Sequence, residues 1–402
     1  MKLIFFLVAF SLISLRMYFS WLGKDRENRG ISESNMVVKS DNFLEKISYV
    51  GKFQLLDDES GFKSISPGGY FKYEMNDERV KAESNLKGEI EYTLYDGKDN
   101  LVVSDDKGKK LLKEAIKEMI AWGYDAQGRM ERIYKKEGVK GLLAEVDSMR
   151  VSQTKIVYLN RLFSLIDSLS PEDQVLVVDK VKSLNSDMDE RQLLEKIPLT
   201  QLKNPKISAT YFDVAGGINS DMDKASILNH YLNLDTITTE NTFKLLRVSA
   251  TLNSDMDKAN VYKKTIEKGI INGPGYDSLL NLVSDINSDM DKANLYKELI
   301  ALGNISEAQW IDLVDKISSI NSDMDKANLY KELIRMDNIS EALWVDLIGK
   351  VSSMNSDMDK ANLLVAIASK MPKTDIVKTN YQKAAKTINN DMDYGKVMRA
   401  ME

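Results

Sequence analysis

Residues 321–354 read NSDMDKANLYKELIRMDNISEALWVDLIGKVSSM, and this stretch sets the architecture of more than half of the chain. Its opening Asn-Ser-Asp-Met-Asp string returns at an interval of 34 residues, with no insertion between copies. The seven copies begin at Asn185, Asn219, Asn253, Asn287, Asn321, Asn355 and Asn389, and only the seventh has Asn in place of Ser at its second position. A fixed period of this length is typical of stacked repeats, in which each unit buries its apolar face only against its neighbours.

Each repeat is predicted to be two short antiparallel helices. In the copy quoted above, apolar side chains recur every three or four residues from Met324 to Ile334, a spacing that indicates one buried helical face. A second apolar stripe runs from Trp344 to Met354, after a serine cap at Ser340. The period matches that of tetratricopeptide repeats, but their residue pattern is absent. The prediction is therefore an α-α solenoid of 34-residue helical hairpins, broadly TPR-like or HEAT-like.

The Ser-x-x-Asp spacing at the start of each copy predicts a capping box. The Ser322 hydroxyl would accept from the third backbone N–H of its helix, and the Asp325 carboxylate would reach back to the N–H of the cap. Both aspartates of the motif also place negative charge at the positive end of the helix dipole. The predicted structural caps are Ser186, Asp189, Ser220, Asp223, Ser254, Asp257, Ser288, Asp291, Ser322, Asp325, Ser356, Asp359 and Asp393.

The Asn-x-Asp-x-Asp string also invites comparison with a calcium-binding loop. The twelfth loop position is acidic in two copies, at Glu298 and Glu332, but it is Lys196, His230, Lys264 or Ala366 in others. The sixth position, which an EF-hand fills with glycine, is usually lysine here. We therefore predict helix caps rather than a metal site.

No constellation of catalytic residues is apparent in the sequence. His230 is the only histidine and there is no cysteine, so neither a zinc site nor a Ser-His triad is expected. We predict no catalytic residue, no metal and no cofactor, and hence no enzymatic activity.

The lysine that follows each Asp-Met-Asp is predicted to line up beside acids of the neighbouring repeats. The members of this ladder are Lys258, Lys292, Lys326 and Lys360. Two interpretations stay open: a ridge of surface ion pairs, each of which stabilises little, or a polar binding edge for a peptide or protein.

The first 44 residues differ from the rest. Residues 1–23 begin with one lysine followed by a long uncharged apolar run, which predicts a cleavable signal peptide or a retained N-terminal anchor. A span over residues 3–23 would place Arg16 within the bilayer, which is costly. Both alternatives put the remainder outside the cytoplasm, either periplasmic or secreted. Residues 24–44 are predicted to be a linker.

Residues 45–104 alternate apolar and polar side chains, which predicts a small antiparallel β-domain of four to five strands. One pair of strands is expected on either side of Gly51, further strands over Phe71–Met75 and Ile90–Leu94, and an Asp-Gly hairpin leading to Leu101–Val103. Residues 105–150 are predicted to be a helical connector and residues 151–402 the α-solenoid, with a degenerate repeat at 151–184. The fold class is therefore α+β.

Four features together resemble a known group. They are SISPGGYFKYE (Ser64–Glu74), a helix that ends at Trp122, the segment Ala126–Met149, and the Ser-Asp-x-Asp-Lys units. They resemble bacterial extracytoplasmic proteins that combine a small β-domain with tandem helical repeats, and that also occur behind membrane metallopeptidases of the β-lactam-sensor type. The resemblance implies a place outside the cytoplasm. It implies no protease activity, because the His-Glu-x-x-His zinc motif is absent; the chain also has methionine, from Met188 to Met392, where the group has an aromatic residue.

Composition narrows the class of function. The chain has 402 residues, 43% apolar content and a net charge of −6 with both signs interspersed, which argues against nucleic-acid binding. The predicted function is an exported, non-enzymatic scaffold that binds a protein or peptide through its repeat surface. The alternative is an envelope sensor or regulatory module that is anchored in the membrane through residues 3–23.

Overall fold

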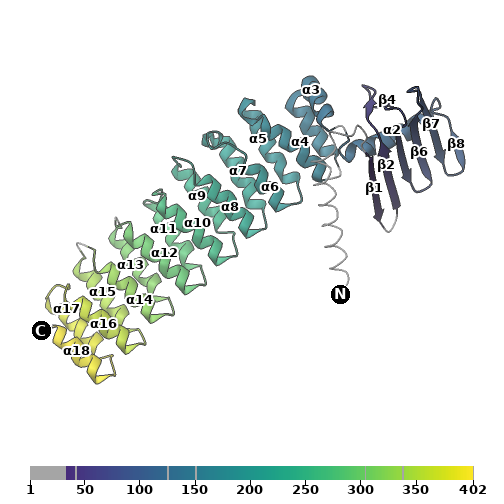
Figure 1. Cartoon of the computed structure of the whole chain (residues 1–402). Helices are drawn as coiled ribbons and strands as arrows, with labels where there is room; N and C mark the ends of the chain where they lie inside the picture. Colours follow the sequence, from purple (N-terminus) through teal and green to yellow (C-terminus); the bar gives the residue numbers. More distant parts are fainter. Residues whose placement is uncertain are drawn as a thin grey trace. The chain divides into compact units, whose positions relative to one another are not determined.

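A small antiparallel sheet domain followed by an array of helical hairpins makes up the computed structural model of the chain (Figure 1). The structure describes residues 33–40, 43–124, 126–149, 152–303, 305–336 and 339–401, with side-chain burial from residue 46 onward. The predicted signal or anchor at residues 1–23 lies outside this part. The chain divides into one unit of residues up to 138 together with 144–157, and a second of 139–143 together with 158–402.

The first unit is built on a six-stranded sheet with strand order β1-β2-β5-β6-β7-β8, and a separate β3-β4 hairpin. The strands are β1 (Glu33–Ser40), β2 (Phe43–Val50), β3 (Phe53–Leu55), β4 (Phe62–Ile65), β5 (Tyr70–Met75), β6 (Glu78–Ser84), β7 (Ile90–Asp96) and β8 (Asp99–Leu101). The expected Asp-Gly hairpin is present between β7 and β8, where Asp96 pairs with Asp99. Gly97 there has a φ of 62°, in the left-handed region that glycine adopts without strain.

Three sequence predictions for this domain are corrected by the structure. Strand β1 lies within residues 24–44, so the linker prediction is wrong over 33–40. The strands on either side of Gly51 do not pair with each other, because β2 pairs with β1 and β5 whereas β3 pairs with β4. Strand β6 was not predicted, since Val80 and Ala82 are its only apolar residues.

Helix α2 (Asp106–Ala121) belongs to the β-domain rather than to a connector. Its Leu112, Ile116 and Met119 are buried in the same core as Phe71 and Val80 of the sheet. Burying each such side chain stabilises the fold by about 1.5–3 kcal/mol. The predicted boundary at residue 104 therefore falls inside one hydrophobic core.

The helices after α2 are α3 (Ala126–Ser148), α4 (Ser152–Ser164), α5 (Pro171–Asp179), α6 (Asp187–Leu194), α7 (Pro205–Gly217), α8 (Asp221–Tyr231), α9 (Thr239–Ser249), α10 (Asp255–Glu267), α11 (Pro274–Ser284), α12 (Asp289–Ala301), α13 (Glu307–Ser318), α14 (Asp323–Leu333), α15 (Glu341–Ser352), α16 (Asp357–Ala368), α17 (Asp375–Ala385) and α18 (Asp391–Met401). Short 3-10 turns lie at Ile166–Ser168, Lys180–Ser183 and Gln201–Lys203. Helix α3 is interrupted at Gly138, where φ is 64°.

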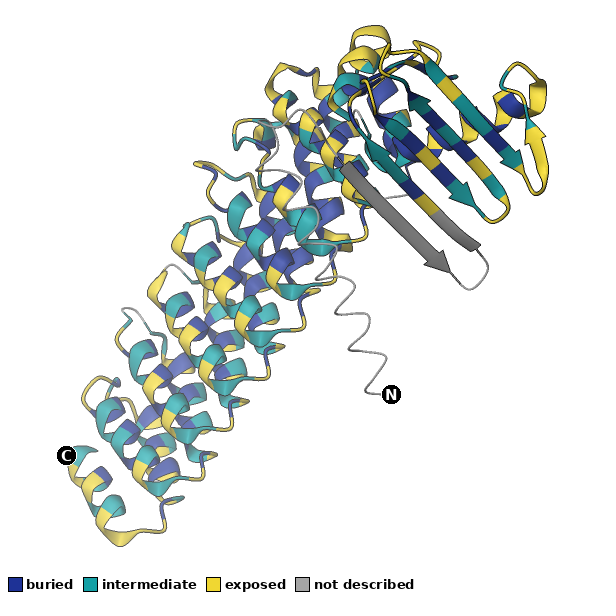
Figure 2. Ribbon diagram, turned by 45° about the vertical axis from the view of Figure 1, so that its right-hand side comes forward, coloured by how far each residue is buried: buried dark blue, intermediate teal, exposed yellow. Residues whose placement is uncertain are grey.

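The array has two layers (Figure 1). The first helix of each repeat, α6 to α18 in even numbers, packs beside the first helix of the next repeat, and the second helices, α7 to α17 in odd numbers, do the same. Equivalent tyrosines of successive first helices, Tyr262, Tyr296 and Tyr330, are fully buried. Figure 2 shows the buried residues concentrated between the layers. The continuous core between repeats that the apolar stripes predict is therefore present.

Candidate functional site

The serine of each repeat motif is an N-cap. The Ser322 hydroxyl accepts from the Asp325 backbone N–H at 3.2 Å, and the five other serines make the same bond at 3.2–3.3 Å. In the seventh copy the side chain of Asn390 replaces the hydroxyl and accepts from the Asp393 N–H at 3.0 Å. The caps predicted at these serines are therefore formed.

The first aspartate of the motif joins one repeat to the next. Asp323 Oδ2 accepts from the backbone N–H groups of Asn355 at 2.6 Å and Ser356 at 2.7 Å, at the start of the following first helix. The same pair of bonds extends from Asp187, Asp221, Asp255 and Asp357, and Asp289 accepts from Asn321 at 3.1 Å. We call these residues the clamp aspartates.

The clamp changes the role predicted for the second aspartate. The cap N–H of Ser356 is bound by Asp323 of the preceding repeat, not by Asp359 of its own. Asp223 instead accepts from the Arg191 guanidinium at 2.7 Å. The reciprocal capping box that was expected at Ser-x-x-Asp is found at a second helix, where Ser306 and Gln309 satisfy each other.

Two of the repeat lysines, Lys326 and Lys360, are held by contacts within the array. Lys326 Nζ lies 3.0 Å from the second carboxylate oxygen of the clamp aspartate, Asp323 Oδ1, and Lys360 Nζ donates to the Thr387 carbonyl at the end of its own repeat at 3.0 Å. Burial would raise the pKa of Asp323, but the N–H of Ser356, the Lys326 ammonium and the N–H of Asn355 together hold it below its usual value. The clamp is therefore a charged group held at the junction between repeats.

The contacts of Lys326 and Lys360 do not support the predicted polar binding edge of repeat lysines. Lys360 is only 5% exposed, so it is not accessible to a partner. Lys326 is engaged by Asp323, and Lys258 and Lys292 are half-buried. The aspartates that pair with Lys326 and Lys360 belong to their own repeat, rather than to a neighbour as predicted.

The residues considered for metal binding and catalysis are dispersed. Within the described part of the chain, no group of three or more His, Cys, Asp or Glu side chains could hold a metal ion. The loop that would wrap around calcium continues as helix after the cap, for example in α14. His230 is half-buried, and its Nε2 lies 3.3 Å from the Ile197 carbonyl.

Within the Ser-Asp-Met-Asp motif, the methionine is the residue whose side chain is exposed to solvent. The exposed fractions are 71% for Met222, 66% for Met256, 68% for Met290, 60% for Met324, 62% for Met358 and 77% for Met392. We call these six side chains the methionine row. The prediction that Met324 belongs to the buried stripe is wrong. Met324 and Leu333 are nine residues apart, and at 3.6 residues per turn this places their side chains about 180° apart around the helix axis. Met324 therefore points away from the core in which Leu333 lies.

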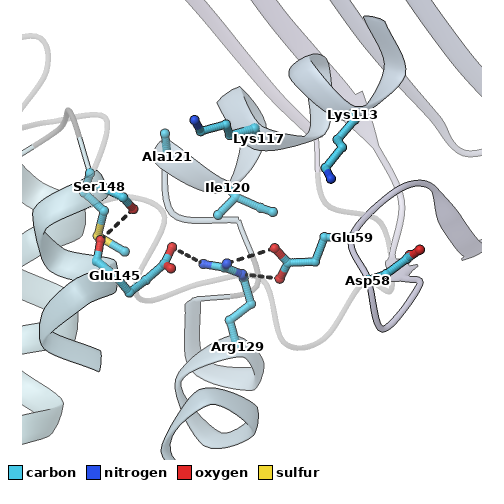
Figure 3. Close-up of a pocket in the computed structure, with 10 residues that line it drawn as sticks. Asp58, Glu59, Lys113, Lys117, Ile120, Ala121, Arg129, Glu145 and Ser148 are labelled. Carbon is cyan, nitrogen blue, oxygen red and sulfur yellow. Dashed lines mark hydrogen bonds and ion pairs between the residues drawn. The ribbon is translucent and has the colours of Figure 1, made fainter. Parts of the chain in front are cut away.

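A cavity of about 310 Å³ opens in the first unit (Figure 3). Its most buried charged group is Arg129 of α3, which donates to both carboxylate oxygens of Glu59, at 2.6 and 2.9 Å, and to Glu145 at 2.6 Å. Lys113 and Lys117 of α2 also line it. Figure 3 shows the Arg129 guanidinium between the two carboxylates.

This arrangement is an ion-pair lock rather than an anion site, because two carboxylates already compensate the guanidinium. Through Glu59 it ties the loop after β3 to α3, and through Glu145 it joins the two parts of α3 on either side of Gly138. The ion pair could not be predicted from the sequence, because Glu59 and Arg129 lie 70 residues apart and neither belongs to a periodic pattern. The left-handed φ of 55° at Glu59 leaves no clear signature in the sequence either.

Comparisons with known proteins add little. Neither the models of protein families nor the curated proteins contain a match to this chain. Among solved structures, one similar chain comes from the computational design of self-assembling cyclic protein homo-oligomers, with 12% identity over 71% of this chain and 92% of that chain and a TM-score of 0.14. At that TM-score the likeness carries no argument about function. No helix in the described part of this chain is long and apolar enough to cross a membrane.

Proposed function

We propose that the protein is a non-enzymatic scaffold that binds a protein or peptide through the surface of its helical repeats. The observation that carries the proposal is the methionine row. The serine of the motif caps its helix, the clamp aspartate joins two repeats, and Lys224, Lys326 and Lys360 bond within their own repeats, whereas the methionine faces solvent in six successive copies. Methionine is flexible and polarisable, and it is common on surfaces that accept partners.

Site-specific cross-linking tests this function. A photoreactive amino acid replaces Met290 in the full chain, and in a matched variant it replaces Asn281, an exposed residue of the second helix layer. Each variant is expressed in the source cells and irradiated. We expect a cross-linked protein product from position 290 and none from position 281. Equal products from both positions, or no product from either, would contradict the proposal.

We also propose that the scaffold works outside the cytoplasm. The support is the sequence of residues 1–23, with its single lysine and apolar run. A reporter enzyme that folds only outside the cytoplasm, fused after Glu402, should be active. Activity only of a cytoplasmic reporter would overturn this location. An uncleaved N-terminus in mass spectrometry of the native protein would favour the anchored regulatory module instead.

A further inference from the structure

Three first helices present the same outward spine. Each reads Met, Asn and Lys at positions i, i+4 and i+7, which lie on one face of a helix. The members are Met256, Asn260 and Lys263 on α10, Met290, Asn294 and Lys297 on α12, and Met324, Asn328 and Lys331 on α14. Because α10 packs beside α12 and α12 beside α14, the spines form three parallel rows of thioethers, amides and ammonium groups.

The amide row is free to bind. Asn260, Asn294 and Asn328 are exposed, and their side chains make no hydrogen bond to any other described residue. Lys297 and Lys331 likewise form no ion pair within the described part of the chain. This contrasts with Lys326 and Lys360 of the motif, which pair with the clamp aspartates Asp323 and Asp357.

The surface between the spines is hollowed. A cavity of about 370 Å³ lies between α10 and α12, and its polar lining comprises Asn260, Lys263, Asp291, Asn294, Lys297 and Glu298. The residue types that line it recur 34 residues later, between α12 and α14. The lysine of the row is Val365 in the next repeat, so the complete pattern covers three helices.

The chemistry of the rows matches a peptide backbone. An asparagine amide carries both donors and an acceptor, as a peptide group does. Adjacent packed helices lie about 8–10 Å apart. A polyproline II chain advances about 9.3 Å per turn of three residues, and its N–H and C=O groups are unpaired. One backbone group per turn can therefore meet one asparagine per helix.

The two outer rows determine which side chains fit. At about 1.5 Å per residue along a helix, the methionine row lies about 6 Å to one side of the amides and the lysine row about 4.5 Å to the other. An apolar side chain complements the thioethers. An acidic side chain complements the ammonium groups of Lys297 and Lys331, whereas Lys263 already lies 3.9 Å from Glu267. The rows thus match a three-residue repeat of one apolar residue, one acidic residue and one residue that faces solvent.

We propose that the spines of α10, α12 and α14 bind an extended peptide in the polyproline II conformation, with an acidic residue at every third position. This inference deepens the proposed function and rests on it.

A labelled synthetic peptide tests the inference with the full chain. The probe is four Leu-Glu-Pro triplets, in which proline favours the polyproline II backbone, and binding is followed by fluorescence anisotropy. The site variant is Asn294→Ala with Lys297→Glu; alanine is the stronger helix former, so α12 is expected to stay folded. The matched control is Asn281→Ala with Lys383→Glu, two exposed positions of second helices.

We expect the wild type and the control variant to bind alike, and the site variant to bind at least about tenfold more weakly, which corresponds to about 1.4 kcal/mol. A Leu-Lys-Pro peptide and a peptide of four-residue Leu-Glu-Gly-Pro units should bind weakly to all three proteins. No binding to the wild type, equal binding to the site variant, or equal binding of the Leu-Lys-Pro peptide would overturn the inference. If the site variant, carrying the photoreactive group at position 290, still gives its cross-linked product, the scaffold function survives and only this binding mode is wrong.

Discussion

Within each repeat motif, the two aspartates perform different tasks although they lie two residues apart. Asp323 accepts two backbone N–H groups of the next repeat and pairs with Lys326. Asp325 contributes its backbone N–H to the cap, and its carboxylate contributes mainly through the helix dipole.

Removing the clamp should therefore destabilise more than removing its neighbour. We expect Asp323→Ala to lower the free energy of unfolding by about 1.5–3 kcal/mol, the range for hydrogen bonds to a charged group. Asp325→Ala should cost about 0.3–1 kcal/mol. Urea denaturation of the two variants measures the difference. Equal costs would show that the bonds between repeats do not stabilise the array.

Glu190 departs from the repeat pattern, because the next five copies have lysine at its position. Burial, with a smaller contribution from the nearby Asp187 carboxylate, raises the pKa of Glu190 to about 7. A folded-state pKa above the unfolded value means that the folded protein holds this proton more tightly. The contribution of Glu190 to stability is therefore largest below about pH 4.5, where the unfolded carboxyl group is also protonated, and it falls as the pH rises towards 7.

Glu190→Gln mimics the protonated side chain and tests this pH dependence. We expect the variant to melt at a higher temperature than the wild type at pH 8 and at a similar temperature near pH 4.5. Thermal denaturation followed by circular dichroism across this range gives both profiles. Parallel profiles at all pH values would mean that Glu190 does not titrate between 4.5 and 7.

The first helices have a solvent face and a core face, and the methionine row belongs to the solvent face. Met324→Ser should change the free energy of unfolding by no more than about 0.5 kcal/mol, as expected of an exposed position. Leu333→Ala, at a fully buried position of the same helix, should cost about 2–5 kcal/mol. Denaturant melts compare the two. A large loss from the serine variant would place Met324 in the core after all.

In the β-domain, the loop after β3 and helix α3 are joined through Arg129, whose side chain is 7% exposed. Arg129→Met should destabilise by about 1–3 kcal/mol, less than for a fully buried pair because Glu59 and Glu145 are partly exposed. Adding Glu59→Gln and Glu145→Gln should restore part of the loss, since the repulsion between unpaired carboxylates disappears. Urea melts of the single and triple variants measure it; no recovery would argue against an ion-pair lock.

As a whole, the array consists of interchangeable units whose stability is roughly a sum of repeats and interfaces. Deleting residues 287–320 removes one complete period and joins Ile286 to Asn321, just as Ile320 precedes Asn321 in the native chain. We expect a folded protein with a smaller urea m-value, because less surface is exposed on unfolding. Deleting only residues 304–320 should disrupt the fold, because it removes the second helix of one repeat, α13, and leaves the first helix of that repeat without its partner. Circular dichroism and urea melts distinguish the two, and loss of helix in the first deletion would contradict the additive description.

Much of this molecule follows from local sequence. The period, the paired helices, the buried stripes and the serine caps each depend on residues within one 34-residue unit, where spacing along the chain translates directly into position on a helix. The Asp-Gly hairpin of the β-domain was predictable for the same reason. These features need no knowledge of distant partners.

The candidate sites depend on contacts between distant residues. The clamp aspartate meets backbone groups 32 and 33 residues later, and Arg129 meets Glu59 across 70 residues, so neither could be recognised from local spacing. Strand β1 is a strand because it pairs with β2 at the sheet edge. The outward direction of Met324 was missed because repeated steps of three residues drift around the helix. A residue's place along the chain sets the helix it belongs to, but packing between repeats sets whether it joins units together or remains free to meet a partner.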